Sequence, residues 1–508
     1  MASRLASRWS ATASSAQQPA IISRRYTSVA SATAASSLPG DFKHAIEKAA
    51  SLATPDPPSD SPTARLVADQ TPYMVPTYIR PPPMFHKGEG CYLWDVENRR
   101  YLDFTAGIAV NGLGHCDPGV SNAIAQQART LIHSSNLYYN PWTGSLSKLL
   151  VDLTRSSGAM LSAARAFICN SGSEANEAAI KFARKIGSQI SPPKDTSSID
   201  PIASTADTAG SRKHEILSFH NSFHGRTLGS LSATPNPKYQ RPFAPMLPGF
   251  RYGIFNDIGS VSSFITENTC SVIVEPIQGE GGINVATPEF LMALRKRCDE
   301  VGALLIYDEI QCGLGRTGTL WAHGPENGIP VEAQPDVLTT AKALGNGFPI
   351  GATLVSEKVS QGIVTGDHGT TFGGNPLACR VAHYVLSRLS DPELQRAVRD
   401  KEALFRHHFH TLQKRFPKVV KEVRGKGLIL GLQLSADPTP VVTACRERGL
   451  LIITAGVNTL RFVPPLVIEQ QEIEEGMRIL EEAMSVVFEV EGPSNIEGTD
   501  GQQEMRAR

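Results

Sequence analysis

The stretch ALLIYDE, residues 303–309, is a run of apolar side chains that ends in two acids. Four other short apolar runs occur in the chain: RAFICN (165–170), EILSF (215–219), CSVIVE (270–275) and GATLVS (351–356). Amphipathic segments of helical length, EANEAAIKFARKIG (174–187) and PEFLMALRKRCDEVG (288–302), lie between them. Buried strands that alternate with helices predict an α/β layer fold with a mostly parallel sheet. Ligands of such folds bind at the carboxyl ends of the strands, so the residues after each run are the candidates for chemistry.

The composition limits the kinds of partner that the chain can have. It has 508 residues, 41% of them hydrophobic, with 49 basic and 49 acidic side chains, which is enough for two domains. The balanced charge gives no indication of a nucleic-acid partner, and no apolar run reaches the about 20 residues that span a membrane. The eight cysteines form no CxxC pair and no metal spacing with histidine, which predicts reduced thiols and no metal site. We therefore expect a soluble protein that acts on small molecules.

The two ends of the chain and one internal stretch differ from the rest. The first forty residues contain four arginines and no acid, which is typical of a transit peptide, and RRYTS (24–28) resembles a matrix-peptidase cleavage site. We expect a transit peptide over 1–26, location in the mitochondrial matrix, and a flexible segment over 27–70; a tail without function is the alternative. Stretches rich in Pro, Ser, Thr and Asp predict unstructured segments at 51–64, 188–213 and 491–508, the middle one as an insertion into the fold.

The stretch TTAKALGNGFPIGA (339–352) places Lys342 among small and apolar residues. Such a lysine can lay its stem along an apolar surface and keep its ammonium in water. The alternative is a partly desolvated amine that is neutral and nucleophilic, as Schiff-base chemistry requires. Asp308 precedes it by a length of chain that suffices to bring the next strand alongside. An acid in this position can cap a neighbouring helix, or it can keep a pyridinium nitrogen protonated.

Two loops could bind an anion or a flat ring. SGSEANE (171–177) leads from a strand into a helix, where Gly172 and Ser173 could hold a phosphate; ordinary capping by Ser173 is the alternative. FHNSFHGRT (219–227) follows the next strand and carries Phe223, which could stack on a flat cofactor, and Arg226, which could hold a carboxylate. Both side chains could instead pack the loop.

The motif GLGRTG (313–318) fits the glycine pattern of dinucleotide-binding folds, but the residues after it argue against that interpretation. The pattern requires a helix that opens at its last glycine, whereas TLWAHGPENGIP (319–330) has Gly324 and Pro325 within two turns. Three other motifs together offer acids, hydroxyl donors for phosphate and a second arginine. They are EPIQGEGG (275–282) with Glu275 and Glu280, HGTTFGGNP (368–376) with Thr370 and Thr371, and LRFVPPL (460–466) with Arg461.

Six motifs in this order resemble those of the class III pyridoxal-phosphate aminotransferases over residues 72–487: SGSEANE, FHGRT, EPIQGEGG, DEIQCGLGRTG, AKALGNGFPIGA and HGTTFGGNP. The resemblance implies fold type I, with a large cofactor-binding domain at 141–378 and a smaller α+β domain formed by 71–140 and 379–490. It implies that pyridoxal 5′-phosphate is the cofactor. Lys342 would be its covalent anchor and the carrier of protons, and Asp308 would pair with the pyridine nitrogen.

The same resemblance implies a cofactor site shared between two subunits. Gly172 and Ser173 would hold the phosphate, helped by Thr371 from the other subunit of a homodimer. Phe223 would stack on the ring, and Gln311 would lie near the ring hydroxyl.

Within the family, YLDFTAGIAVNGLGH (101–115) and LSATPNPKYQRPFAPM (231–246) look most like the members that use N2-acetylornithine. The resemblance implies transfer of its ω-amino group to 2-oxoglutarate, giving glutamate and N-acetylglutamate 5-semialdehyde in arginine biosynthesis. Ile108 stands where relatives that use free ornithine have an aromatic, and it leaves room for an acylated nitrogen. Arg226 would hold the remote carboxylate of both substrates. Arg461 would bind the α-carboxylate of 2-oxoglutarate and be neutralised by Glu280 in the other half-reaction.

Thr370 and Tyr78 are further candidates for contact with the substrate. Three rival hypotheses remain at this point. The first is another ω-aminotransferase, acting on ornithine, succinylornithine or γ-aminobutyrate. The second is a scaffold that keeps the fold without catalysis, against which the presence of Lys342, Asp308 and Phe223 argues. The third is a nicotinamide-binding protein built on GLGRTG.

Overall fold

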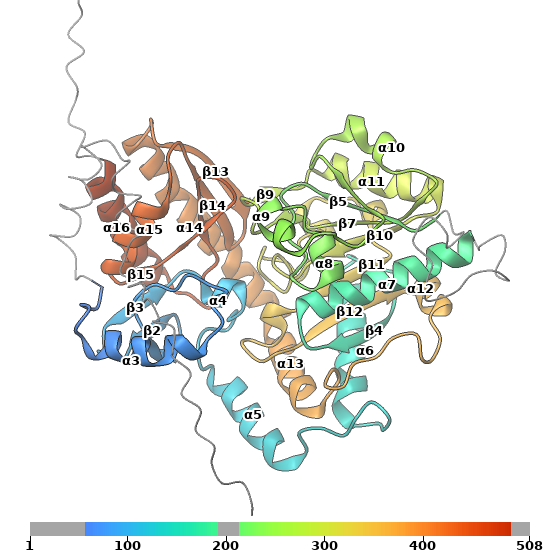
Figure 1. Cartoon of the computed structure of the whole chain (residues 1–508), viewed down its shortest axis with the longest axis horizontal. Helices are drawn as coiled ribbons and strands as arrows, with labels where there is room; N and C mark the ends of the chain where they lie inside the picture. Colours follow the sequence, from blue (N-terminus) through green and yellow to red (C-terminus); the bar gives the residue numbers. More distant parts are fainter. Residues whose placement is uncertain (1–55, 192–212, 489–508) are drawn as a thin grey trace, which may run out of the picture.

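The computed structural model describes residues 56–191 and 213–488, and its centre is a seven-stranded sheet (Figure 1). The strand order is β4-β12-β11-β10-β7-β5-β6. The strands are β4 (Ala163–Cys169), β5 (Glu215–Phe219), β6 (Phe250–Gly253), β7 (Thr269–Val274), β10 (Leu304–Asp308), β11 (Val337–Thr340) and β12 (Gly351–Ser356). β12 is antiparallel to both neighbours, and all other pairs are parallel. The five predicted strands and the mostly parallel sheet are confirmed. The sequence reading missed β6 and β11, which are short and carry fewer apolar residues.

The central strand β10 shows why the sheet is covered on both faces. Its side chains alternate, so that Leu304 and Ile306 pack with apolar residues of α7 (Gly172–Ile190). Leu305 and Tyr307 point to the opposite face and pack with α11 (Pro288–Val301). Both helices correspond to predicted amphipathic segments. This three-layer arrangement is the expected α/β fold, and it leaves the carboxyl ends of the parallel strands at one edge.

Shorter elements surround this sheet. The remaining helices of this part are α5 (Pro118–Thr130), α6 (Pro141–Ser156), α8 (Leu228–Ser232), α9 (Pro237–Gln240), α10 (Val261–Phe264), α12 (Glu357–Gly362) and α13 (Pro376–Leu389). A small hairpin is formed by β8 (Ile277–Gln278) and β9 (Asn284–Val285). No helix in the described ranges is both long and apolar enough to cross a membrane.

The two ends of the described chain meet in a second, smaller α+β region. The antiparallel sheet β13-β14-β17-β16 packs with helices from the C-terminal part, and a second sheet has the order β1-β2-β3-β15. β15 pairs in parallel with β3, so N- and C-terminal segments lie side by side (Figure 1). The strands are β1 (Phe85–Glu89), β2 (Tyr92–Asp95), β3 (Arg100–Asp103), β13 (Val420–Lys426), β14 (Ile429–Leu434), β15 (Leu450–Leu451), β16 (Ile453–Ala455) and β17 (Thr459–Phe462). The helices are α14 (Pro392–Arg415), α15 (Thr439–Glu447) and α16 (Gln470–Phe488). The domain boundaries given above remain predictions.

The segments expected to lack structure fall mostly outside the described residues. This applies to the transit peptide over 1–26, the tail over 491–508 and most of the insertion over 188–213, of which 188–190 end α7. The expectation for 51–64, and for flexibility up to residue 70, is wrong at its C-terminal end, where α3 (Pro62–Gln70) forms. The Ser and Pro of this stretch start a helix, because Ser61 Oγ accepts from the N–H of Ala64 at 3.0 Å and Pro62 is its first residue.

Candidate active site

A cavity of about 290 Å³ lies at the edge of the large sheet where β4, β5, β10 and β11 end. Among the predicted site residues, Gly172, Ser173, Phe223, Gln311 and Lys342 line it. The complete lining is Val110, Asn170, Ser171, Gly172, Ser173, Phe223, His224, Gly225, Ile310, Gln311, Ala341, Lys342, Gly347, Phe348, Pro349 and Ile350. Each of the five predicted residues follows the end of a strand, as the general rule for α/β sheets requires.

Lys342 follows β11 and has a left-handed backbone, with φ at 43°. Such a conformation costs energy for a residue with a side chain, and strained residues tend to cluster at active sites. Its Nζ donates to the carbonyl oxygen of Ile108 at 3.2 Å. The pKa of the amine is lowered from 10.5 to about 7, mainly by burial and then by the positive charge of Arg461, against the opposing effect of nearby acids. A substantial part of the amine is therefore neutral at physiological pH.

The carbonyl group that faces Lys342 belongs to a left-handed turn. In α4 (Ala106–Ala109), the four residues have φ values of 47°, 64°, 66° and 61° in chain order. L-residues adopt a left-handed turn only at a cost, which surrounding contacts must offset. Asp103 Oδ1 contributes by accepting from the N–H groups of Thr105 at 2.8 Å and Ala106 at 3.1 Å. The turn places Ile108 beside the cavity with its side chain 46% exposed.

Asp308 is buried at the end of β10, with its carboxylate fixed by three donors. Its Oδ2 accepts from Asn176 Nδ2 at 2.8 Å and lies 2.8 Å from His224 Nδ1, while Oδ1 accepts from the N–H of Ile310 at 3.0 Å. Asn176 in turn accepts from Thr339 Oγ1 at 2.8 Å. Sequence reasoning assigned no role to Asn176 or His224. The signal for Asn176 was a polar residue on the inward face of an amphipathic helix.

A second buried acid, Glu275, follows β7. Its carboxylate accepts from the N–H of Phe223 at 3.0 Å and of Gly279 at 3.3 Å. Burial raises its pKa well above the ordinary value, and the negative charge of Asp308 raises it further. Glu275 therefore holds in place the loop that carries Phe223.

The predicted phosphate cup lies at the first turn of α7. Ser171, and not Ser173, caps this helix, since Ser171 Oγ accepts from the N–H of Glu174 at 3.2 Å. Ser173 is thereby free for another role, and its Oγ accepts from the N–H of Arg226 at 3.3 Å. Gly225 has φ at 135°, and a Cβ there would collide with the hydroxyl of Ser173. The first N–H groups of the helix and the lack of a side chain at Gly225 leave a cradle at this turn that could accept an anion.

Arg226 and Arg461 lie in different environments. Arg226 is exposed, and its guanidinium carbon lies 3.6 Å from the ring centre of Tyr239. Arg461 is buried in β17, where burial lowers its pKa to about 10, and its Nη2 donates to Gln311 Oε1 at 2.6 Å. Within the described part of the chain, no ion pair joins Arg461 to Glu280; Glu280 Oε1 instead accepts from the hydroxyl of Tyr239 at 2.6 Å. The expected pairing of Glu280 with Arg461 is therefore not the arrangement in this structure.

The other predicted residues do not line the cavity; they are Tyr78, Ile108, Arg226, Glu280, Asp308, Thr370, Thr371 and Arg461. Thr370 Oγ1 accepts from Nδ2 of Asn170, a lining residue, at 3.1 Å. Thr371 is exposed on the loop after α12. Tyr78 is 71% exposed and precedes β1.

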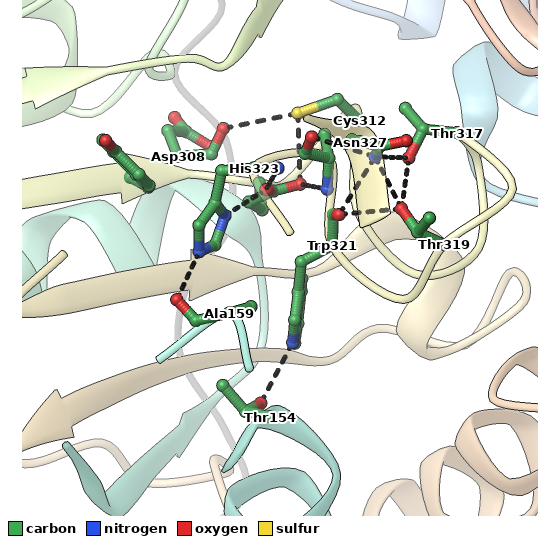
Figure 2. A network of polar contacts seen from close by, with 12 residues as sticks. Thr154, Ala159, Asp308, Cys312, Thr317, Thr319, Trp321, His323 and Asn327 are labelled. Carbon is green, nitrogen blue, oxygen red and sulfur yellow. Dashed lines mark hydrogen bonds and ion pairs between the residues drawn. The ribbon is translucent and has the colours of Figure 1, made fainter. Parts of the chain in front are cut away.

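The loop with the dinucleotide-like glycines has a structural role. No helix opens in residues 313–324, as the sequence indicated. The loop is braced by a buried pair, since His323 Nδ1 lies 2.6 Å from Glu309 Oε1 and His323 Nε2 lies 3.0 Å from the carbonyl oxygen of Ala159. Figure 2 shows His323 between Ala159 and the loop, with Asp308 and Cys312 nearby. The brace fixes the chain on the C-terminal side of Asp308 and Gln311.

Comparisons with known proteins agree with this geometry. A family model described as aminotransferase class-III matches residues 74–484. A relative from Neurospora crassa named "Acetylornithine aminotransferase, mitochondrial" is 63% identical over 440 residues, which are 87% of this chain and 91% of the relative. The Saccharomyces cerevisiae protein of the same name is 45% identical over 83% of this chain and 96% of its own length.

Solved structures show the same likeness. N-acetylornithine aminotransferase from Stenotrophomonas maltophilia is 36% identical, with a TM-score of 0.66 over 82% of this chain and 98% of its own. Ornithine aminotransferase from Toxoplasma gondii is 31% identical, with a TM-score of 0.74 over 84% of this chain and 96% of its own. In the described ranges, no group of three or more His, Cys, Asp or Glu residues could hold a metal ion.

Proposed function

This chain belongs to the class-III aminotransferase family, and we propose that it transfers the ω-amino group of N2-acetyl-L-ornithine to 2-oxoglutarate. The products are N-acetyl-L-glutamate 5-semialdehyde and L-glutamate, in a step of arginine biosynthesis. The observation that carries the proposal is that Lys342 lines the cavity with a lowered pKa, near enough to the buried carboxylate of Asp308 to be affected by its charge. Relatives named for acetylornithine, among them one at 63% identity, support the choice of substrate.

The residues at the cavity fit pyridoxal 5′-phosphate. Gly172 and Ser173, at the start of α7, would hold the phosphate in the cradle that Gly225 leaves open. Phe223 would lie against the ring, and Asp308 would hold the proton of the pyridine nitrogen. When bound, the cofactor supplies an electron sink that stabilises negative charge on the substrate carbon.

Lys342 supplies the covalent anchor and the proton carrier. With its pKa lowered to about 7, Nζ can take a proton from the carbon that bears the substrate's amino group and return a proton later in the cycle. Three hydrogen-bond partners hold the carboxylate of Asp308 in place at the end of β10. The lysine thus moves protons while the aspartate keeps a fixed position.

Two arginines fit the two ends of the substrates. Arg226, exposed beside the cavity mouth, would hold the carboxylate far from the reacting carbon in both half-reactions. Arg461 would bind the α-carboxylate of 2-oxoglutarate, with Gln311 as its partner before the substrate arrives. Ile108 would leave room for the acetylated nitrogen, and Thr370 and Tyr78 remain candidates for substrate contact.

A homodimer would complete the site. Thr371 is exposed and lies outside its own chain's cavity lining, so it is free to reach the phosphate site of a second copy. Apolar side chains are exposed in two segments, 73–79 and 131–139, as a buried interface would require. The most exposed of them are Tyr73, Val75, Tyr78, Ile79, Leu137, Tyr138 and Tyr139. Location in mitochondria agrees with the names of the fungal relatives and with the composition of residues 1–26.

The test is formation of glutamate from N2-acetylornithine and 2-oxoglutarate by the purified protein loaded with cofactor. Parallel lines in double-reciprocal plots are expected, because the first product leaves before the second substrate binds. Lys342→Ala should abolish turnover, while Lys358→Ala, an exposed lysine in α12, should not change it. Equal activity of the wild type and Lys342→Ala would contradict the proposal.

A further inference from the structure

Tyr239 connects three of the predicted site residues, although it lies in α9 and sequence reasoning gave it no role. Its hydroxyl donates to Glu280 Oε1 at 2.6 Å. The guanidinium carbon of Arg226 lies 3.6 Å from its ring centre, a cation–π contact. Its ring also meets the ring of Phe223 edge-on, with 6.1 Å between centres. One side chain therefore touches the groups expected at both ends of the substrate and at the cofactor ring.

We propose that Tyr239 is a positioning residue that determines which substrate the site favours, because its hydroxyl holds Glu280 apart from Arg461 while its ring fixes Arg226. This inference rests on the proposed aminotransferase function. It adds a specific task to a residue outside the six family motifs. The task concerns the choice between an amine donor and a dicarboxylate acceptor.

Glu280 could pair with Arg461 or with Tyr239, and the two pairings would have opposite effects on how Arg461 binds a substrate carboxylate. The negative charge of Glu280 raises the pKa of Arg461, although burial lowers that pKa by more. The two groups are therefore close enough to interact electrostatically. Among the described residues, Glu280 and Arg461 nevertheless form no ion pair. Glu280 Oε1 instead accepts a hydrogen bond from the Tyr239 hydroxyl. A hydrogen bond to a charged acceptor is among the strong ones, which makes Tyr239 an effective competitor.

Arg461 consequently keeps capacity for a ligand. Its Nη2 donates to Gln311, while its buried Nε has no hydrogen-bond partner among the described residues. A buried guanidinium with an unused donor suits a carboxylate that enters with the substrate. If Glu280 were released from Tyr239, it would compete for this arginine.

The two substrates differ in their need for Arg461. 2-Oxoglutarate brings a carboxylate next to its reacting carbon, whereas N2-acetylornithine has an uncharged methylene chain there. Loss of the Tyr239 hydroxyl should therefore weaken binding of the dicarboxylate and have little effect on the amine donor. A residue that only stabilised the fold would affect both substrates alike.

The experiment compares Tyr239→Phe with the wild type in each half-reaction of the loaded protein. The variant keeps the ring over Arg226 and loses only the bond to Glu280. Loss of a hydrogen bond to a charged group should raise the KM for 2-oxoglutarate about tenfold, with kcat and the KM for N2-acetylornithine within about twofold. Tyr252→Phe is the matched control, because the Tyr252 hydroxyl donates to the carbonyl oxygen of Ser232 at 2.9 Å, and it should change neither KM.

A double-mutant cycle and a measurement without cofactor separate the possible outcomes. In a Glu280→Gln background, Tyr239→Phe should have no further effect on the KM for 2-oxoglutarate, because the competing charge is gone. Calorimetry of glutarate binding to the cofactor-free protein should show about tenfold weaker affinity for Tyr239→Phe and unchanged affinity for Tyr252→Phe. Thermal unfolding verifies that each variant is folded.

Equal increases in both KM values, or equal effects of Tyr239→Phe with and without Glu280, would overturn the inference while leaving the proposed function intact. A wild-type protein that converts neither substrate would overturn the proposed function itself. In that case, unchanged glutarate affinity in Tyr239→Phe would also reject the role of Tyr239.

Discussion

The amine of Lys342 should lose its proton near neutral pH in the cofactor-free protein. Burial, followed by the charge of Arg461, lowers its pKa from 10.5 to about 7. At pH 8 an amine with a pKa of about 7 is about 90% neutral, whereas one at 10.5 is about 0.3% neutral. The structure therefore predicts a neutral fraction roughly 300-fold larger than that of an ordinary lysine at this pH.

Competitive acetylation measures this property directly. The cofactor-free protein is treated with a trace of acetic anhydride from about pH 5 to about pH 11, and labelling of the Lys342 peptide is quantified by mass spectrometry relative to the exposed Lys358. The midpoint for Lys342 should lie near pH 7. Arg461→Met should move it upward, because a neighbouring positive charge is removed, and Asp308→Asn should move it downward. A wild-type midpoint near 10.5 would refute the desolvated lysine.

Three further predictions concern the cradle, the substrate pocket and the brace. Gly225→Ala should weaken cofactor binding at least about tenfold in fluorescence titrations, because the φ of 135° and the collision with Ser173 both oppose a Cβ. Unchanged affinity would show that Gly225 is not part of the cradle. Ile108→Tyr should shift the ratio of kcat/KM for N2-acetylornithine to kcat/KM for ornithine toward ornithine by about tenfold, since an aromatic ring would fill the space for the acetyl group. An unchanged ratio would show that Ile108 does not select the substrate. Glu309→Ala should lower the free energy of unfolding in urea by about 3 kcal/mol, because the buried His323 would lose its carboxylate partner. A loss below about 1 kcal/mol would mean that the pair does not brace the loop.

The sequence was most informative about site residues that directly follow the carboxyl ends of strands. The apolar runs before Gly172, Phe223 and Gln311 could be recognised as strands. Parallel strands bring their carboxyl ends together, so the convergence of these residues followed from the pattern. Lys342 could be placed by the same argument, although β11 before it was too short to be recognised.

Contacts that depend on loops were beyond a sequence argument. Tyr239 sits in a four-residue helix far along the chain from Glu280, and nothing in its neighbourhood indicates that the two side chains touch. The left-handed turn that directs the Ile108 carbonyl to Lys342 has one glycine, whereas four residues adopt positive φ. The sequence likewise does not indicate that Arg461 donates to Gln311 and that Glu280 accepts from Tyr239 in this structure. The pairing of Glu280 with Arg461 in the first half-reaction stays a prediction.

The most direct test of the central claim is a single half-reaction followed in the spectrometer. The protein loaded with pyridoxal phosphate is mixed in turn with N2-acetylornithine, ornithine and γ-aminobutyrate, and loss of the absorbance of the lysine-bound cofactor is recorded. We expect rapid loss with N2-acetylornithine and slow loss with the other two amines. Rapid loss mainly with ornithine or γ-aminobutyrate would contradict the assigned substrate, and absence of the absorbance band would contradict the assigned role of Lys342.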